Sequence, residues 1–433
     1  MNNLRLKALL GAGCVSLAVA GTAQAGGFSR GTADTDILFD PGNFNMRAGV
    51  TYVTPHRDFD KNPVPGLVGT SYTDSYIIPS AAIKLNLSDN FRCAGTMVDN
   101  NGGAATYAVP KLSGKLIEDF STNEKALTCG VNFQAGPGNF WLLGGGFAED
   151  FRYHRENALR PLPGPNGSVA LPNVNLDLEG QEFGYRIGAA YEIPEIAFRA
   201  QLMYRSGTDY GATGSVVMPT AALLGSQAQS LQAQAQAALA AGNLAQAQQL
   251  GAAAQQALQQ AMGAAAAGLS QEFDAIGIGN LPQSVEFKLQ SGIAPGWLAF
   301  GAIKWSDWSV QKELLVKTTN PAIGSEDIYN WRDGWTVTGG VAHAFNDSVS
   351  GLVSLTWDRG VGTGWDLSSD AYTLVLGGLV KDPIGGELRG GVGFSYLASA
   401  SETAYFGANG EDQNQSVKAG YAVALNLGYN IRW

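Results

Sequence analysis

The sequence predicts an all-β protein: a fourteen-stranded antiparallel β-barrel that spans a membrane, with a short N-terminal segment and a helical insert in one external loop. Three observations lead to this fold. The end of the chain alternates strictly between apolar and small or polar residues, its start has the pattern of a secretory leader, and no later apolar run is long enough for a membrane-spanning helix. A membrane protein without such helices has to satisfy its backbone hydrogen bonds as a closed barrel.

The stretch 417–433 is the clearest strand. Every second residue is apolar or aromatic, as at Tyr421 and Leu427, and small or polar residues such as Asn426 lie between them. Period-two alternation indicates a strand, and a long apolar face ending in aromatic residues is typical of a strand between lipid and lumen. A half-buried strand of a soluble sandwich has the same alternation, but rarely over so long a run.

The N-terminus has the three parts of a signal peptide. Arg5 and Lys7 precede an apolar run over residues 8–20, and Ala25 ends a small-residue site for cleavage. The run is shorter than the ~20 residues that a spanning helix needs. We therefore expect residues 1–25 to be removed and the mature protein to begin at Gly26.

Alternation recurs from residue 45 onward, and it predicts fourteen strands, an even number that suits a barrel. The predicted strands cover 45–55, 72–87, 90–99, 124–135, 138–153, 181–193, 195–210, 283–294, 296–318, 335–345, 348–360, 371–381, 386–400 and 416–433. Their connections are alternately short and long. Since outer-membrane barrels have short periplasmic turns and long external loops, we expect all the long connections on the outside.

One predicted loop differs in composition from the rest of the chain. Residues 220–272 are rich in Ala and Gln, which are strong helix formers, and Gly242-Asn243 is a natural break. This pattern predicts two consecutive helices. The same composition also fits a low-complexity surface insertion that is only partly ordered.

Charge and cysteine content restrict the class further. The net charge of −10 argues against nucleic acid as a partner. Cys93 and Cys129 remain after the leader, each on an alternating segment beside outward-type residues. They fit either a disulfide between neighbouring strands or two small residues that face lipid.

No catalytic, metal or cofactor site is expected. Gly27 to Gly31 match the G-x-S-x-G pattern of hydrolase nucleophile elbows, but that pattern needs a preceding strand and a following helix. The two mature cysteines and three scattered histidines have no metal-ligand spacing. We therefore expect a protein that is not an enzyme.

The alternation also assigns candidate ligand-binding residues to the lumen. Basic residues fall on inward faces of neighbouring strands in apolar surroundings, and large apolar residues share one of these faces. The basic candidates are Arg205, Lys288 and Lys304, and the apolar candidates are Phe300 and Trp308. A water-filled porin has a polar lumen, so this mixture favours passage of an apolar compound with an anionic end. For any single one of these residues, interior packing or a structural ion pair is a more common explanation of the position than ligand contact.

Several stretches resemble the long-chain fatty acid outer-membrane transporters of the FadL family. The segment LPQSVEFKLQSGIAPGWLAFGAIKWSDWSV (281–310) resembles the family's LP-x-x-x-E segment, its Pro-x-Trp turn and a strand ending in [ST]-x-W-S. QLMYRS (201–206) resembles the L-x-YRS strand, and AGVTYV (48–53) the first strand. The order and spacing of the strands agree with those of this family along nearly the whole mature chain. Aromatic hydrocarbon channels are relatives that share the same fold.

The resemblance implies a monomeric barrel over 45–433 in a Gram-negative outer membrane, plugged by an N-terminal hatch over 26–44. It also implies capture of ligand by external loops and lateral exit at a kinked third strand. Asp40, Pro41 and Gly42 stand where the family has Asn-Pro-Ala in its hatch, so that motif is altered and the hatch is about half the usual length. The third-strand kink falls on Asn100, Asn101, Gly102 and Gly103.

The expected function is therefore passive uptake of long-chain fatty acids or similar hydrophobic compounds, by a barrel whose outer surface contacts outer-membrane lipid. Aromatic hydrocarbon uptake by the same fold is the closest alternative. A general polar porin, which the shortened hatch allows, and an adhesive surface barrel that displays the helical insert are the others.

Overall fold

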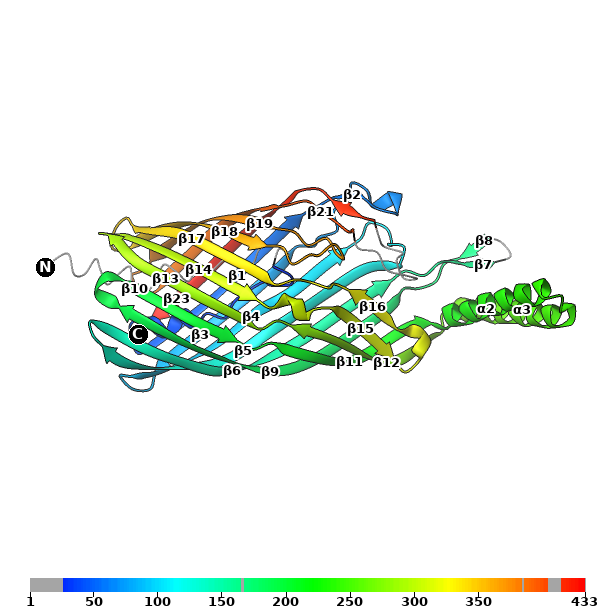
Figure 1. The fold of residues 1–433 in the computed structure, drawn as a ribbon, viewed down its shortest axis with the longest axis horizontal. Helices are drawn as coiled ribbons and strands as arrows, with labels where there is room; N and C mark the ends of the chain where they lie inside the picture. Colours follow the sequence, from blue (N-terminus) through cyan, green and yellow to red (C-terminus); the bar gives the residue numbers. More distant parts are fainter. Residues whose placement is uncertain (1–25, 165–166, 384, 404–413, 433) are drawn as a thin grey trace.

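The computed structural model describes residues 26–164, 167–383, 385–403 and 414–432. The predicted signal peptide, 1–25, lies outside the described residues. Figure 1 shows one elongated barrel of tilted strands, from one end of which a pair of helices projects.

The barrel wall is one closed antiparallel sheet of eighteen labelled strands. Four barrel strands are each divided in two by a short break, so the ring has fourteen barrel strands, as predicted. The undivided ones are β1 (Phe44–His56), β3 (Tyr76–Asn86), β4 (Phe91–Thr106), β5 (Lys115–Ala135), β6 (Gly138–Asn157), β9 (Val174–Ile193), β18 (Val349–Arg359), β19 (Ala371–Lys381), β20 (Glu387–Leu397) and β23 (Gly420–Arg432). The divided ones are β10 (Phe198–Arg205) with β11 (Thr208–Pro219), β12 (Ser270–Leu281) with β13 (Ser284–Ala294), β14 (Trp297–Ser306) with β15 (Glu313–Thr318), and β16 (Ser325–Ile328) with β17 (Gly334–Ala344).

The ring closes between its first and last strands. β1 pairs with β23 from Asn45 opposite Arg432 to His56 opposite Tyr421, and its other edge pairs with β3. Smaller elements are not part of this ring of strands. They are the strands β2 (Phe59–Lys61), β7 (Leu162–Gly164), β8 (Gly167–Val169), β21 (Ala400–Ser401) and β22 (Ser416–Val417), and the 3-10 helices η1 (Thr35–Phe39), η2 (Pro65–Leu67), η3 (Pro194–Ile196), η4 (Trp308–Val310) and η5 (Pro321–Ile323).

The alternation of β23 sorts its side chains as predicted. Tyr421 and Leu427 are exposed on the outer surface, whereas Ala422, Ala424 and Asn430 are buried inside. An outward aromatic row continues on the neighbouring strands, because Tyr421 lies opposite Tyr396. Tyr396 in turn lies opposite Tyr372, and Tyr372 opposite Trp357. Such a girdle marks the interface between the bilayer and water.

The strands extend further beyond the bilayer than the alternation indicated. β4 runs to Thr106 and β5 begins at Lys115, so most of the loop predicted for 100–123 is strand. In the same way, β11 and β12 extend up to the helical insert. Outside the bilayer an outward side chain no longer has to be apolar, so the period-two signal disappears while backbone pairing continues. The end of the barrel that carries the long connections and the helical insert is called the long-loop end below. The opposite end is called the short-turn end.

The Ala/Gln-rich insert forms two helices, as predicted: α2 (Thr220–Ala240) and α3 (Leu244–Ala266). Asn243 begins α3 by accepting a hydrogen bond from the backbone N–H of Gln246 at 3.2 Å. The helices pack through small residues, among them Ala235 and Ala257, and they extend away from the barrel (Figure 1). In the described part of the chain, no helix is both long and apolar enough to cross a membrane.

Cys93 and Cys129 form a disulfide, which decides between the two alternatives that the sequence left open. The two residues lie opposite each other on β4 and β5, and their Cα atoms are 4.0 Å apart. Their neighbours Ala94 and Thr128 are buried inside the barrel, so the disulfide faces outward.

We expect a maleimide to label Cys93 and Cys129 of the denatured protein only after reduction. Closing a chain segment with a sequence separation of 36 residues contributes about 4 kcal/mol of stability in the chain-entropy model. Mass spectrometry of labelled protein with and without reductant checks the pairing. Labelling of both thiols without reductant would contradict it.

Candidate functional site

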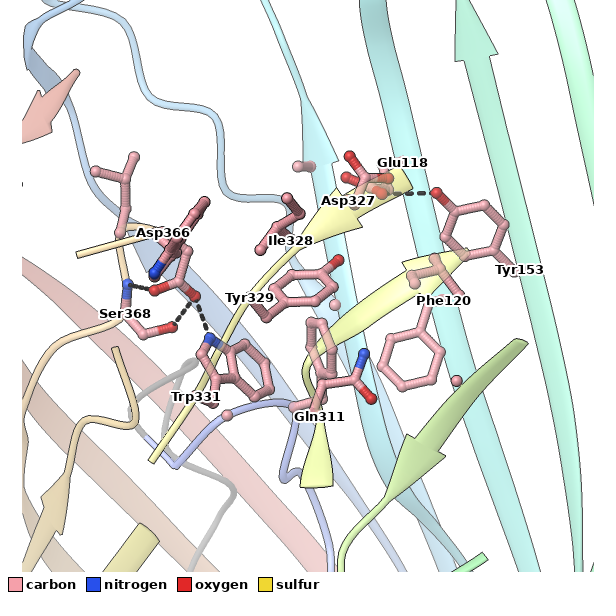
Figure 2. A pocket seen from close by; sticks show the side chains of 18 of the residues that line it. Glu118, Phe120, Tyr153, Gln311, Asp327, Ile328, Tyr329, Trp331, Asp366 and Ser368 are labelled. Carbon is pink, nitrogen blue, oxygen red and sulfur yellow. Dashed lines mark hydrogen bonds between the residues drawn. The ribbon is translucent and has the colours of Figure 1, made fainter. Parts of the chain in front are cut away.

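A cavity of about 340 Å³ lies at the long-loop end of the barrel. Aromatic side chains from widely separated parts of the chain form much of its wall, and Figure 2 shows several of them. They are Phe28, Phe59, Tyr72, Tyr107, Phe120, Phe151, Tyr153, Tyr210, Tyr329, Trp331 and Trp365. A mostly apolar cavity with a few convergent polar groups is the usual form of a small-molecule site.

Phe28 forms the floor of this cavity. Its ring centroid lies 4.7 Å from the ring of Phe120 and 4.7 Å from that of Trp331. Below it, Trp308 packs edge-on against Trp331 with centroids 5.2 Å apart. Gly27 has a φ of +64°, and a Cβ there would lie 2.7 Å from the Trp308 ring, so only glycine lets the backbone bring Phe28 to this position.

The polar groups of the cavity are already engaged with one another. Trp331 donates its indole N–H to Asp366 Oδ2 at 2.6 Å, and Ser368 donates both its hydroxyl and its backbone N–H to the same carboxylate (Figure 2). Burial raises the pKa of the Asp366 carboxyl above its ordinary value. Asp366 thereby holds the Trp331 ring upright in the cavity wall.

A second polar cluster fixes β16 to the barrel wall. Lys115 binds Glu118 at 2.9 Å and Asp327 at 3.1 Å, and Arg155 binds Asp327 at 3.2 Å. Burial opposes ionisation of Asp327, but the charges of Lys115 and Arg155 bring its pKa below the ordinary value. This cluster places Tyr329 over the cavity, because Tyr329 directly follows β16.

Residues 26–43, which we call the hatch segment, run through the lumen below the cavity. Ile37, Leu38 and Phe39 of η1 pack with Trp141 and Met203 in one buried cluster. Ion pairs add to this apolar contact: Lys288 binds Asp36 at 3.2 Å, and Arg199 lies 3.8 Å from the other oxygen of Asp36. The hatch segment is therefore fixed to the wall as well as placed inside it.

The altered hatch motif, Asp40-Pro41-Gly42, is one of these attachment points. Arg47 of β1 binds Asp40 at 2.6 Å and Asp34 at 2.7 Å. Lys84 of β3 donates to the backbone carbonyls of Asp40 and Gly42, both at 2.7 Å. An aspartate in this motif lets the hatch segment bind a wall arginine directly.

The predicted kink segment on the third barrel strand, 100–103, lies at an irregular part of the wall. β4 has a bulge between Asp99 and Asn101, and its regular pairing with β3 ends at Val98 opposite Ser80. The hatch segment occupies the gap: the Arg30 N–H donates to the Asn100 carbonyl at 2.8 Å, and the Gly102 N–H donates to the Phe28 carbonyl at 2.7 Å. The wall is closed here by the hatch segment instead of by a neighbouring barrel strand.

The Arg30 side chain fills the remaining space in this gap. Its guanidinium lies 4.1 Å from the centroid of the Tyr76 ring on β3. On the other side, a Cβ on Gly102 would lie 2.5 Å from the Arg30 Cζ atom. Glycine at 102 therefore gives the guanidinium its room between the two diverging strands.

A buried charged network supports the bulge from inside. Glu124 binds both Arg186 and Arg205, the latter at 2.7 Å. Arg205 also binds Glu149 at 2.8 Å, and Glu149 accepts a hydrogen bond from Asn100. Asn100 of the bulge is thus joined to the ion pairs of four barrel strands.

The structure brings two of the five predicted ligand-binding residues to one cavity and places the other three elsewhere. Arg205 and Lys304 line a common internal cavity of about 70 Å³, but Arg205 is engaged by two glutamates and Lys288 by the hatch segment. Among the described residues, the Lys304 ammonium has no ion-pair partner within 4.0 Å. Phe300 packs with Leu298 near the short-turn end, whereas Trp308 lies beneath the aromatic cavity at the long-loop end.

Most of the aromatic residues of the cavity lie where the sequence predicted loops. Tyr107 and Phe120 fall in the predicted loop 100–123, and Tyr329 and Trp331 in the predicted loop 319–334. A usable signal was present, because polar surface loops seldom carry so many large aromatic residues. No group of three or more His, Cys, Asp or Glu residues that could hold a metal occurs in the described ranges.

Comparisons with known proteins agree on the fold. Residues 121–350 match the family model described as "Outer membrane protein transport protein (OMPP1/FadL/TodX)". The structure is similar to that of a Pseudomonas aeruginosa FadL homologue, with 12% identity, a TM-score of 0.66 and coverage of 95% of this chain and 98% of that chain. It is also similar to the Ralstonia pickettii toluene transporter TbuX (12% identity, TM-score 0.61, 100% of both chains). The Pseudomonas putida toluene transporter TodX gives 12% identity, a TM-score of 0.59, and 96% and 99% coverage.

None of the curated protein sequences matches the chain. The family model nevertheless covers more than half of the 433 residues. This protein therefore belongs to the outer membrane transport proteins of the OMPP1/FadL/TodX family, and it is a β-barrel of the Gram-negative outer membrane.

Proposed function

We propose that this protein is a passive transporter that takes up long-chain fatty acids or similar hydrophobic compounds as a monomer. The observation that carries the proposal is the aromatic cavity at the long-loop end, directly above the hatch segment. Burial of an acyl chain contributes about 0.8 kcal/mol per methylene, so apolar contact alone can hold the ligand. Lys111 at the cavity wall supplies a cation for an anionic end.

The route inward follows from what blocks the lumen. The hatch segment is held to the wall by ion pairs below the cavity, which disfavours straight passage. At the β4 bulge, in contrast, the hatch backbone and the Arg30 side chain fill the gap between β3 and β4. A ligand that displaces Phe28 from the cavity floor also pulls on the two hydrogen bonds that close this gap. Lateral exit between β3 and β4 is therefore part of the proposal.

Aromatic hydrocarbons are the second candidate substrate class. The cavity wall favours them, because aromatic rings stack well on aromatic side chains. Two structurally similar proteins are toluene transporters by name. Competition between oleate and toluene for the purified barrel separates the two classes.

Uptake of labelled oleate by cells with and without the protein tests the transport proposal itself. Faster uptake with the protein supports it, and equal uptake rejects it. Planar bilayer recordings test the polar porin alternative, since a barrel filled by its hatch segment should be nearly silent.

We expect Trp331→Ala to weaken ligand binding about tenfold, because loss of one ring contact of about 1.4 kcal/mol corresponds to that factor. Equilibrium binding of labelled oleate, with labelled toluene in parallel, measures the effect. Trp297→Ala serves as the control, since Trp297 is exposed on the outer surface near the short-turn end. Equal affinities for the wild type and Trp331→Ala would remove the cavity from the proposed route.

We expect Arg30→Ala to speed ligand release, because it empties the space between Tyr76 and Gly102. Release of labelled oleate from preloaded protein into lipid vesicles should accelerate several-fold while the binding affinity stays similar. Arg152→Ala is the matched control, because the Arg152 side chain is exposed on the outside of β6. Unchanged release from Arg30→Ala would argue against lateral exit through this gap.

A further inference from the structure

The outer surface of the barrel carries an apolar groove that is separate from the aromatic cavity and lies beside the gap between β3 and β4. It has a volume of about 660 Å³ and crosses β3, β4, β5, β6 and β9. One row of outward positions runs through it, with Ile83 opposite Gly95, Gly95 opposite Leu127, and Leu127 opposite Gly146. The two glycines leave notches on either side of Leu127, whose side chain is 59% exposed.

Nothing inside the protein requires glycine at these two positions. A Cβ on Gly95 would meet no atom within 4 Å, and a Cβ on Gly146 would meet only the Gly184 carbonyl at 3.6 Å. Glycine weakens a strand, and outward positions of a membrane barrel are normally large and apolar. A strand glycine without an internal reason often marks the close approach of something else.

The polarity of the groove changes along its length. Its floor and lower walls are apolar, and Phe183 projects beside it with 72% of its surface exposed. Lys125 lies at its upper edge, nearer the long-loop end than Leu127 on the same strand. The Lys125 ammonium binds Asp150 at 2.6 Å, and Gln181 donates to the other oxygen of Asp150, also at 2.6 Å.

This order of groups fits an amphiphile that lies with its chain toward the membrane centre and its head toward the exterior. An ammonium has three N–H donors, and Asp150 engages one of them, so Lys125 can also bind a phosphate oxygen. The surface faces hydrocarbon in an outer membrane, where an apolar depression is filled by acyl chain and not by water. We propose that this groove is a binding site for one acyl chain of a phosphorylated lipid of the outer leaflet, with its phosphate beside Lys125.

Photo-crosslinking in a defined bilayer tests the proposal. The full mature chain is placed in vesicles of phosphatidylethanolamine and phosphatidylglycerol that contain phosphatidylglycerol with a diazirine on one acyl chain. After irradiation, mass spectrometry locates the labelled peptides. We expect preferential labelling of the peptides that contain Gly95, Leu127 and Gly146.

Filling the notches gives the decisive variant. Gly95→Leu combined with Gly146→Leu should lower labelling of these peptides at least fivefold, and the open surroundings of both positions allow the barrel to fold. Gly339→Leu is the matched control: a Cβ there also meets nothing within 4 Å, and β17 lies on the opposite side of the ring. Heat-modified migration on gels confirms folding of each variant.

Two outcomes would overturn the proposal. Labelling of the groove that stays unchanged in the double variant would mean that lipid contacts this surface no differently from the rest of the barrel. Displacement of the phospholipid label by free oleate would mean that the groove holds the transported ligand instead. Lys125→Ala should reduce labelling by the anionic phospholipid about threefold, and an unchanged value would remove the phosphate contact.

Discussion

Arg47→Ala should turn a nearly silent barrel into a conducting pore. Arg47 holds two carboxylates of the hatch segment, Asp34 at 2.7 Å and Asp40 at 2.6 Å, and Asp40 is only 3% exposed. Removing one partner of a buried ion pair costs roughly 3–5 kcal/mol, because the remaining charge is left uncompensated. The hatch segment escapes this cost by leaving the wall, so the lumen opens. Single-channel recordings in planar bilayers measure the change.

Arg152→Ala provides the control for the Arg47 experiment. Its partner Glu179 is 3.7 Å away, and both side chains are more than three-quarters exposed on the outer surface. Exposed ion pairs contribute little, about 0–1 kcal/mol, so this variant should stay silent. A silent Arg47→Ala barrel that is folded would show that the hatch segment is held in place without Arg47, by the apolar contacts of η1 and by its bonds to Lys84 and Lys288.

Glu124→Gln should be the most destabilising single substitution in the barrel wall. Glu124 is 2% exposed and neutralises both Arg186 and Arg205. An amide of the same shape leaves the two guanidinium groups with one fewer negative charge between them. We expect the free energy of unfolding to fall by about 3–5 kcal/mol, as for other broken buried pairs. Urea unfolding in lipid vesicles, followed by tryptophan fluorescence, measures this loss.

Asp150→Asn tests whether burial of the ion pairs causes the large loss of stability expected for Glu124→Gln. It removes one charge from the Lys125 pair, whose lysine side chain is 58% exposed. The expected loss is below about 1 kcal/mol. Equal losses for Glu124→Gln and Asp150→Asn would mean that the internal network contributes no more than a surface pair.

The barrel itself could be predicted because the bilayer imposes a regular pattern on the sequence. Where a strand crosses lipid, every second side chain has to be apolar, and β23 shows this without interruption. The even number of strands and the two helices of the insert followed from the same kind of local signal. Beyond the girdle this constraint ends, which is why the ends of β4 and β5 and the breaks at Ser206 and Asp307 were not found.

The candidate site was harder to predict, because it depends on contacts between distant segments. Phe28, Phe120 and Trp331 meet in three dimensions but have no common spacing in the sequence. Inward position alone selected Arg205 and Lys288, yet it could not show that glutamates and the hatch segment already engage their charges. Alternation in the sequence shows which face of the sheet a residue lies on. Which residues it contacts across the lumen is known only once the strands have closed into a ring.

The seam between β1 and β23 constrains the order in which the molecule assembles. The ring is completed only when residues 420–432, at the very end of the chain, meet residues 45–56. The hatch segment directly precedes that first strand, and part of its backbone is hydrogen-bonded to β4 of the barrel wall. We therefore expect the hatch segment to enter the lumen before the β1–β23 seam closes, so that closure of this seam is the step that retains it there.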